Sequence, residues 1–237
     1  MHTERRSPCV LKWRITCRHP VIADVIWLNR MASPFDNADQ FEKLTKSIAT
    51  DMQTLAFHWR LYGDLRSSVG EFETELNESC TFWNLTFDAH RDATLFRLCR
   101  IYDQHSNALN LRNWLIAMRD NQDHFDASKP MPTTTELQYD IPLVSDCDPE
   151  VKMIVRLRNN LIAHRAAKSI TCAATAASNC SPKHDDIDLL INRAREVVNK
   201  YTTYLNRESF STTIVGHDDY RNVLESVRAR IAQLRNQ

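Results

Sequence analysis

Residues 157–166, LRNNLIAHRA, combine side chains that could act together on a phosphate group. An arginine binds phosphate oxygens through its planar guanidinium group and stabilises negative charge that develops around phosphorus. A histidine titrates near neutral pH and can accept or donate a proton. Arg158 and His164 supply these two groups, and Asn159 supplies an amide that can hold an oxygen atom or fix the imidazole ring.

These three side chains suffice for cleavage of RNA without a metal ion. The ribose 2′-hydroxyl would lose its proton, attack the adjacent phosphate and leave a 2′,3′-cyclic phosphate. The surrounding segment, residues 151–168, contains no acidic residue, although the rest of the chain is mildly acidic. We therefore expect a local surface that attracts anions, the alternative being an ordinary solvated helix face.

The spacing of Arg158 and His164 indicates a composite site. Six positions along an ideal helix correspond to about 9 Å along the axis and about 120° around it, so the two side chains are not stacked neighbours. A second copy of the same helix could bring them together, since a two-fold dimer places one surface against itself.

The elements that must position these residues are predicted to be helices. Apolar residues recur at steps of three and four from Phe41 to Tyr62, and again from Phe72 to Tyr102. There are three glycines, and no proline lies within residues 35–129, so we expect two helices, each longer than 25 residues. The sequence thus predicts an all-α antiparallel helical bundle with two long N-terminal helices and the motif on a later helix.

Shorter segments complete this prediction. Ala108 to Met118 should form a short helix, and residues 121–147, with three prolines, should form a long loop across the bundle. Asp148 is a good N-cap before Pro149, so the motif helix should begin there and run to about residue 170. Residues 171–183 should be a loop, and further helices should cover residues 187–204 and 220–234.

Composition limits the classes of protein. The net charge is zero, because residues 1–30 have a balance of +4 and the remainder −4, so the chain is not a basic nucleic-acid coat. Seven scattered cysteines favour a reducing cytoplasm. Cys9, Cys17 and His19 lack a second ligand pair, so we expect no metal site and no cofactor. No apolar run approaches the roughly 20 residues that span a membrane.

Three regions follow from these patterns. Met31 opens a segment typical of a protein start, so residues 1–34 are expected to be an N-terminal extension that a misassigned start codon would explain. Residues 35–210 should form the helical domain, and residues 211–237 a C-terminal helix.

The segment LRNNLIAHR resembles the Arg-Asn-x4-His motif of HEPN domains. The preceding segment, FWNLTFDAHRDATLFRLCRIYDQHSNALNLRNWL, is similar to the AbiU-type abortive-infection branch, and the resemblance covers roughly residues 38–205. It implies a cytoplasmic homodimer with paired motifs at its interface, acting as a metal-independent ribonuclease in phage defence or in a toxin–antitoxin system. The implied partners are RNA and an antitoxin protein, with no membrane.

The resemblance also implies roles for residues. Arg158, His164 and Asn159 would be catalytic, and Arg156 and Arg165 would bind substrate phosphate. Asp103, at the end of RLCRIYD, is placed with this substrate-binding group, where it would orient Arg158 or His164; a helix-end salt bridge is the alternative for it.

One departure and two other functions stay open. Some HEPN toxins carry a tyrosine two residues after the histidine, which an antitoxin modifies, whereas this chain has Ala166. A non-catalytic nucleotide-binding, RNA-binding or dimerisation module is one alternative. A helical DNA-binding regulator is the other, and the neutral charge and the lack of a helix-turn-helix pattern oppose it.

Overall fold

The computed structural model describes residues 38–124, 131–159, 182–206 and 209–237, and these residues form α-helices and no strand. The all-α prediction is therefore confirmed for the part of the chain that is described. The α-helices are α1 (Ala38–Ser67), α2 (Glu73–Glu78), α3 (Cys80–Ile101), α4 (Leu111–Asp120), α5 (Thr134–Leu143), α6 (Pro149–Leu157), α9 (His184–Asn206) and α10 (Tyr220–Arg235).

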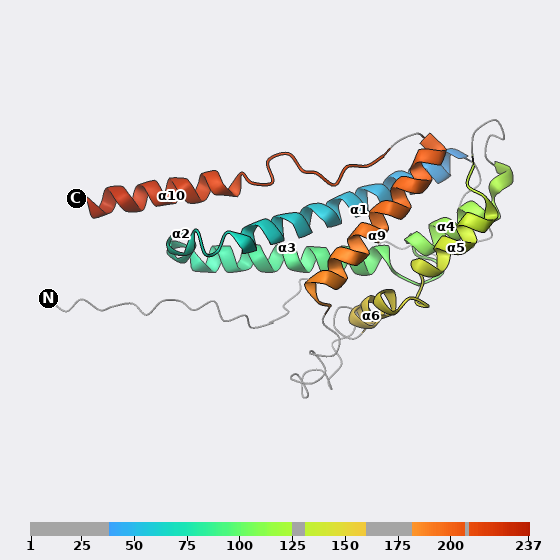
Figure 1. The fold of residues 1–237 in the computed structure, drawn as a ribbon, viewed down its shortest axis with the longest axis horizontal. Coiled ribbons are helices and arrows are strands. Elements are labelled where there is room, and N and C mark those ends of the chain that lie inside the picture. The colour runs from blue at the N-terminus through green and yellow to red at the C-terminus, as the bar shows by residue number, and fades with distance from the viewer. Residues whose placement is uncertain (1–37, 125–130, 160–181, 207–208) are drawn as a thin grey trace.

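The two long helices α1 and α3 lie side by side and antiparallel, and α9 crosses them (Figure 1). Residues of α1 at helical spacing, among them Phe41, Ile48, Met52 and Leu55, are buried in the core between these helices. Tyr102 at the end of α3 donates its hydroxyl hydrogen to the carbonyl oxygen of Leu190 in α9, at 2.7 Å. The end of α3, where the candidate site begins, is thus fixed against α9.

The predicted second long helix is interrupted. The first helix does exceed 25 residues, since α1 has 30, but α2 ends at Glu78 and α3 has 22 residues. Ser79 separates them with φ −133° and ψ 48°, outside the helical region. The apolar periodicity continues through Phe72 and Leu76 because both are buried against the same core, so the periodicity alone did not reveal the break.

The predicted loop over residues 121–147 is wrong, because α5 occupies its centre. The Thr133 hydroxyl accepts the backbone N–H of Glu136 at 3.2 Å, and the Glu136 carboxylate accepts the backbone N–H of Thr133 at 2.8 Å. This reciprocal capping box starts the helix. Pro142 lies in the last turn, next to the helix end, so it does not interrupt the earlier part of α5.

The remaining helix predictions agree with the structure where it describes them. Asp148 caps α6 and Pro149 begins it, as expected, while the predicted continuation from residue 160 to about 170 lies outside the described residues. Helices α9 and α10 cover the two predicted C-terminal segments. None of the described helices is long and apolar enough to cross a membrane.

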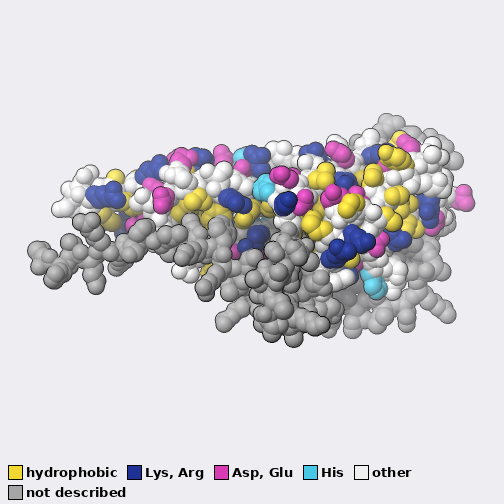
Figure 2. All heavy atoms as spheres, turned by 60° about the horizontal axis from the view of Figure 1, so that its bottom comes forward, with side chains coloured by type: hydrophobic (Ala, Val, Ile, Leu, Met, Phe, Trp, Pro, Cys, Tyr) yellow, Lys and Arg dark blue, Asp and Glu magenta, His cyan; other side chains and the backbone are white. Residues whose placement is uncertain are grey.

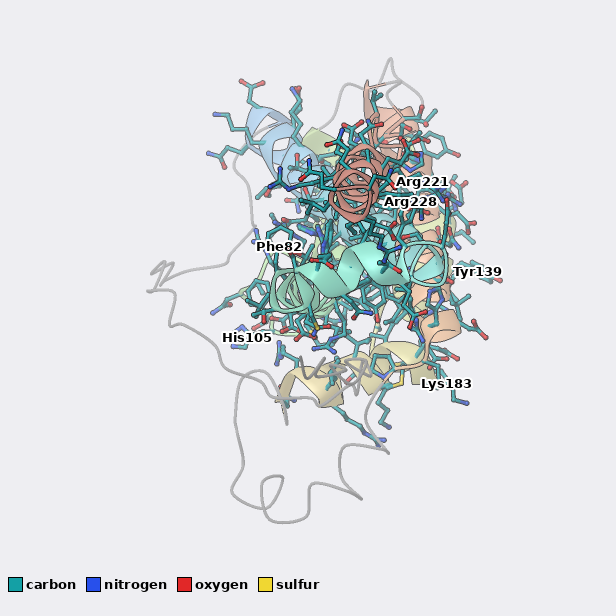
Figure 3. The ribbon with its side chains drawn as sticks, turned by 90° about the vertical axis from the view of Figure 1, so that its left-hand side faces the viewer. Phe82, His105, Tyr139, Lys183, Arg221 and Arg228 are labelled. Atoms are coloured by element: carbon teal, nitrogen blue, oxygen red, sulfur yellow. The ribbon has the colours of Figure 1, made fainter. Side chains whose placement is uncertain are left out.

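Helix α10 packs on α2 at one end of the molecule (Figure 1). Arg221 and Arg228 lie over the ring of the buried Phe72, at 5.5 and 4.5 Å from its centroid. Arg228 also donates to the Glu75 carboxylate at 2.6 Å. These contacts hold the C-terminal helix on α2, at the end of the molecule away from α6 (Figure 1), and Arg221 and Arg228 are labelled in Figure 3.

Candidate functional site

The motif begins at the end of a short, firmly anchored helix. The Asp148 carboxylate accepts the backbone N–H groups of Glu150 and Val151, both at 3.1 Å, which caps α6. Val151, Ile154 and Leu157 are buried along one face of α6. Because that face is held in the core, the residue that follows Leu157 has a fixed position at the edge of the bundle.

Arg158 occupies that position and forms an ion pair with Asp103 at the end of α3. It keeps helical dihedrals, with φ −54° and ψ −52°. Its Nη1 donates to Asp103 Oδ1, and the two side chains are 28% and 19% exposed. A pair that is largely shielded from water yet still accessible holds its arginine more firmly than a surface pair. The ion pair thus joins the residues that follow α3 and α6, which lie 55 positions apart in the chain.

Asn159 holds a second edge of the same guanidinium group. Its side-chain oxygen Oδ1 accepts from Arg158 Nε at 3.1 Å and from Nη2 at 2.9 Å. A guanidinium group has five N–H donors, and these contacts with Asp103 and Asn159 use three. The two that remain have no partner among the described residues, and there is one on each terminal nitrogen. Each of these N–H groups can donate to a phosphate oxygen.

Arg156 is not brought to this position. It is exposed, and because it precedes Arg158 by two residues, its side chain leaves the helix about 200° around the axis from that of Arg158. The two arginines of one chain therefore point to different sides of α6 and do not bind the same small ligand. His164 and Arg165, the other motif residues, lie outside the described residues, so the pairing of Arg158 with His164 stays a prediction.

Cys99 lies behind the ion pair and is chemically inert. Its Sγ is 3.8 Å from the carbonyl oxygen of Ile154, and the residue is 3% exposed. Burial raises the pKa of the Cys99 thiol to about 12, with Arg158 lowering it and Asp103 raising it to smaller extents. The thiol stays protonated at neutral pH, so Cys99 is a packing residue rather than a nucleophile.

His105 also contacts this site through its backbone, although no motif in the sequence pointed to it. Its backbone N–H donates to Asp103 Oδ1 at 2.9 Å, the same oxygen that accepts from Arg158. The signal in the sequence is an aspartate two residues before the histidine, a spacing at which the carboxylate can accept a backbone N–H and close a turn. The spacing does not show that the carboxylate also holds an arginine from another helix.

One group of side chains elsewhere has metal-ligand types at close range. His184, Asp185 and Asp188 at the start of α9 have ligand atoms within 4.8 Å of one another. Asp188 already accepts from His184 Nδ1 at 2.9 Å and from the Trp59 indole N–H at 2.5 Å. Acidic residues are favourable in the first turn of any helix, so these contacts explain the group as a helix start packed on α1.

Basic side chains lie on and beside α6, and acidic side chains lie among them. Lys152, Arg156 and Arg158 come from this segment, while Asp148 and Glu150 stand at its start and Asp103 pairs with Arg158. Figure 2 shows a group of basic side chains on this face, next to acidic ones.

Comparison with known proteins places these features in a family. The family model for AbiU2, a branch of the HEPN domains, matches residues 38–225, which span every described helix up to the first part of α10. No curated protein and no solved structure matches the chain closely enough to be compared. The matched segment includes α3 with Asp103 and α6 with Arg158. The chain therefore belongs to the AbiU2 family of HEPN domains.

Proposed function

We propose that this protein is a metal-independent endoribonuclease of the HEPN type that acts in phage defence by abortive infection, or in a toxin–antitoxin system. The observation that carries the proposal is the state of Arg158. Asp103 and Asn159 hold its guanidinium group, and its other two N–H donors have no partner among the described residues and can bind a phosphate. Fixing an arginine in this way lowers the cost of ordering it when a substrate binds.

The proposed reaction uses the motif residues as follows. His164 takes the proton of a ribose 2′-hydroxyl, and the resulting oxygen attacks the adjacent phosphorus. The bond from phosphorus to the 5′-oxygen breaks, and that oxygen takes a proton from water, so the products are a 2′,3′-cyclic phosphate and a free 5′-hydroxyl. Arg158 stabilises the charge on the phosphoryl oxygens, and Asn159 holds Arg158 in place. Arg165, and Arg156 on the far side of α6, would bind flanking phosphates.

The active form is proposed to be a homodimer in the cytoplasm. Within one copy Arg156 lies on another face of α6 and cannot add hydrogen-bond donors beside Arg158. The motif of a second copy would supply those donors. An antitoxin protein would act by covering the paired motifs. Ala166 cannot be modified as a tyrosine is, so control by such modification is not part of the proposal.

The test is expression of the wild type, Arg158→Ala and His164→Ala in bacteria, with growth curves and total RNA on gels. We expect the wild type to arrest growth and fragment RNA, and both variants to do neither while keeping melting temperatures close to that of the wild type. Equal growth of all three strains with intact RNA would contradict the proposal.

A non-catalytic module is the second candidate, and the same ion pair supports it. Asp103 neutralises Arg158 and joins the end of α3 to the end of α6, which is also what a structural arginine does. In this case Arg158→Ala would dissociate a dimer or lower the free energy of unfolding by clearly more than the ~1 kcal/mol of the ion pair itself, and the wild type would bind RNA or a nucleotide without cutting it. Cleavage that persists in a chelator such as EDTA would exclude this candidate.

A further inference from the structure

Helix α3 carries apolar side chains on two opposite faces. One face, with Trp83, Phe87 and Leu98, is buried in the core against α1. The opposite face carries a second line of apolar residues, called here the outer stripe, at steps of three, four, four and three: Phe82, Leu85, Ala89, Ala93 and Phe96. These steps keep the five residues on one side of a helix. An apolar stripe of this kind normally faces a packed neighbour.

The large side chains of the outer stripe lack such a neighbour among the described residues. Phe82, Leu85 and Phe96 are 60%, 64% and 53% exposed. Phe82 lies at the outer edge of the bundle (Figure 3), where its ring contacts that of Trp83 at 5.1 Å between centroids. Single exposed apolar residues are normal, but several in line on one helix mark an interaction surface. The outer stripe contains no charged residue, so its partner should also be apolar.

The outer stripe is symmetric about Ala89. Phe82 and Phe96 are both seven positions from Ala89. Leu85 and Ala93 are both four positions from it. A two-fold axis through Ala89, perpendicular to α3, would therefore place Phe82 of one copy beside Phe96 of another, and Leu85 beside Ala93. A two-fold interface requires such a self-complementary surface. The small side chain of Ala89 would lie at the axis, where it allows two helices to approach closely.

The charges beyond the outer stripe follow the same symmetry. Glu78, the last residue of α2, and Arg100, near the end of α3, are both eleven positions from Ala89, and both are exposed. In an antiparallel pair of α3 helices, Glu78 of one copy would face Arg100 of the other at each end. In a parallel pair Glu78 would face Glu78, which is repulsive. Complementary charge therefore favours a second copy in the antiparallel orientation.

We infer that the outer stripe is a dimer interface, in which α3 packs antiparallel against α3 of a second copy around an axis at Ala89. This interface is separate from the paired motifs of the proposed function. Asp103 lies fourteen positions beyond Ala89, about 21 Å along a helix, so the two Arg158–Asp103 ion pairs would be about 40 Å apart. They could not bind the same phosphate. A protein that used both interfaces would form an assembly larger than a dimer.

The experiment is analytical ultracentrifugation of the full-length protein over a series of concentrations. We expect the wild type to reach at least twice the 27.5 kDa of one chain and to dissociate on dilution, since a standard interface has about 20–30 residues a side and this one has fewer. Ala89→Arg places two like charges at the axis and should halve the mass. Ala232→Arg, the same change at an exposed alanine of α10, should keep the wild-type mass. Melting curves verify that both variants fold.

A cysteine at the axis tests the register of the two helices. In Ala89→Cys the new thiol of one copy would lie beside that of the other, so mild oxidation should give a covalent dimer. The wild type, which has seven cysteines of its own, and Ala232→Cys should give clearly less of it under the same conditions.

Two results would overturn the inference. One is a wild type that is monomeric at every concentration, in which case another segment of the chain or a different protein covers the outer stripe. The other is an Ala89→Arg variant with the mass of the wild type, combined with no added crosslinking in Ala89→Cys. The copies would then associate through another surface, such as the motifs.

Failure of this inference is distinguishable from failure of the proposed function. RNA cleavage per chain is measured for the wild type and Ala89→Arg, and we expect equal rates because the outer stripe lies far from Arg158. A wild type that associates through Ala89 but cuts no RNA would support the interface and contradict the nuclease. Loss of cleavage together with the loss of mass in a folded Ala89→Arg would overturn the separation of the two interfaces.

Discussion

Replacement of Asp103 by asparagine should separate the placement of Arg158 from the stability of the fold. The asparagine side chain would keep the shape of the aspartate and an oxygen that can accept the backbone N–H of His105. It would lose the negative charge that pairs with Arg158. The variant therefore removes one contact of Oδ1 and leaves the other.

The expected cost follows from the exposure of the pair. A hydrogen bond to a charged group contributes about 1.5–3 kcal/mol when buried, and an exposed ion pair about 0–1 kcal/mol. With side chains 28% and 19% exposed, the Arg158–Asp103 pair lies between these cases, so Asp103→Asn should lower the free energy of unfolding by about 1 kcal/mol. Asp103→Ala also loses the bond to the His105 N–H and should cost about 2 kcal/mol.

In Asp103→Asn the barrier to RNA cleavage should rise by more than the free energy of unfolding falls. Without its charged partner, the Arg158 side chain can adopt more rotamers, and ordering it to bind a phosphate then costs additional conformational entropy. A cost of about 1.4 kcal/mol corresponds to a 10-fold lower rate of RNA cleavage. The assay is cleavage of a fluorescent RNA below KM, with urea unfolding of the same preparations. Asp51→Asn is the matched control, because Asp51 also pairs with arginines (Arg97 and Arg100) but has no contact with Arg158 or Asn159 among the described residues.

The reasoning is refuted if Asp103→Asn cleaves RNA as fast as the wild type or faster. It is equally refuted if Asp51→Asn, at a similar loss of stability, reduces cleavage to the same extent. In the first case the ion pair with Asp103 does not contribute to cleavage by Arg158. In the second case the lower rate of cleavage reflects a general loss of stability.

Three further predictions concern the scaffold. Burial lowers the pKa of His58 and His90 from their ordinary value of 6.5, and their Nδ1 atoms are 3.0 Å apart. The melting temperature should therefore be level above about pH 6.5 and fall as the pH drops below it, with a smaller fall in His90→Phe. Thr133→Ala should cost about 1 kcal/mol in urea unfolding, whereas no change would mean that the capping box is unimportant. Because the hydrogen bond from Arg228 lowers the pKa of Glu75, Glu75→Gln should weaken the docking of α10 and speed hydrogen exchange there about 10-fold, leaving α1 unchanged.

Much of the fold could be predicted because local signals and burial agree. The Asp148–Pro149 pair starts α6 both in the sequence and in the structure, and the apolar spacing of α1 is the face it buries. The helix α5 was missed for a physical reason. Threonines and prolines are typical of loops, but here Thr133 caps a helix and Pro142 stands at its end.

The site could be predicted only in part, because its contacts join distant segments. The motif identified Arg158 and Asn159, and the end of α3 identified Asp103. Periodicity on one helix could not show that Asp103 reaches Arg158, since that depends on how α3 packs against α6. The contact of the His105 backbone with Asp103 was missed because the hydrogen bonds that fix this turn involve asparagines on α4 and before it, which carry no signal by themselves.

The most direct test of the central claim is cleavage of a short RNA by the purified protein in EDTA, compared with the same RNA carrying one 2′-deoxyribose at the cut site. The account predicts that the wild type cuts the all-ribose RNA to a 2′,3′-cyclic phosphate and a 5′-hydroxyl and leaves the substituted site intact. Arg158→Ala and His164→Ala should cut neither. Cutting at the 2′-deoxy position, or activity that EDTA abolishes, would contradict attack by the 2′-hydroxyl without a metal.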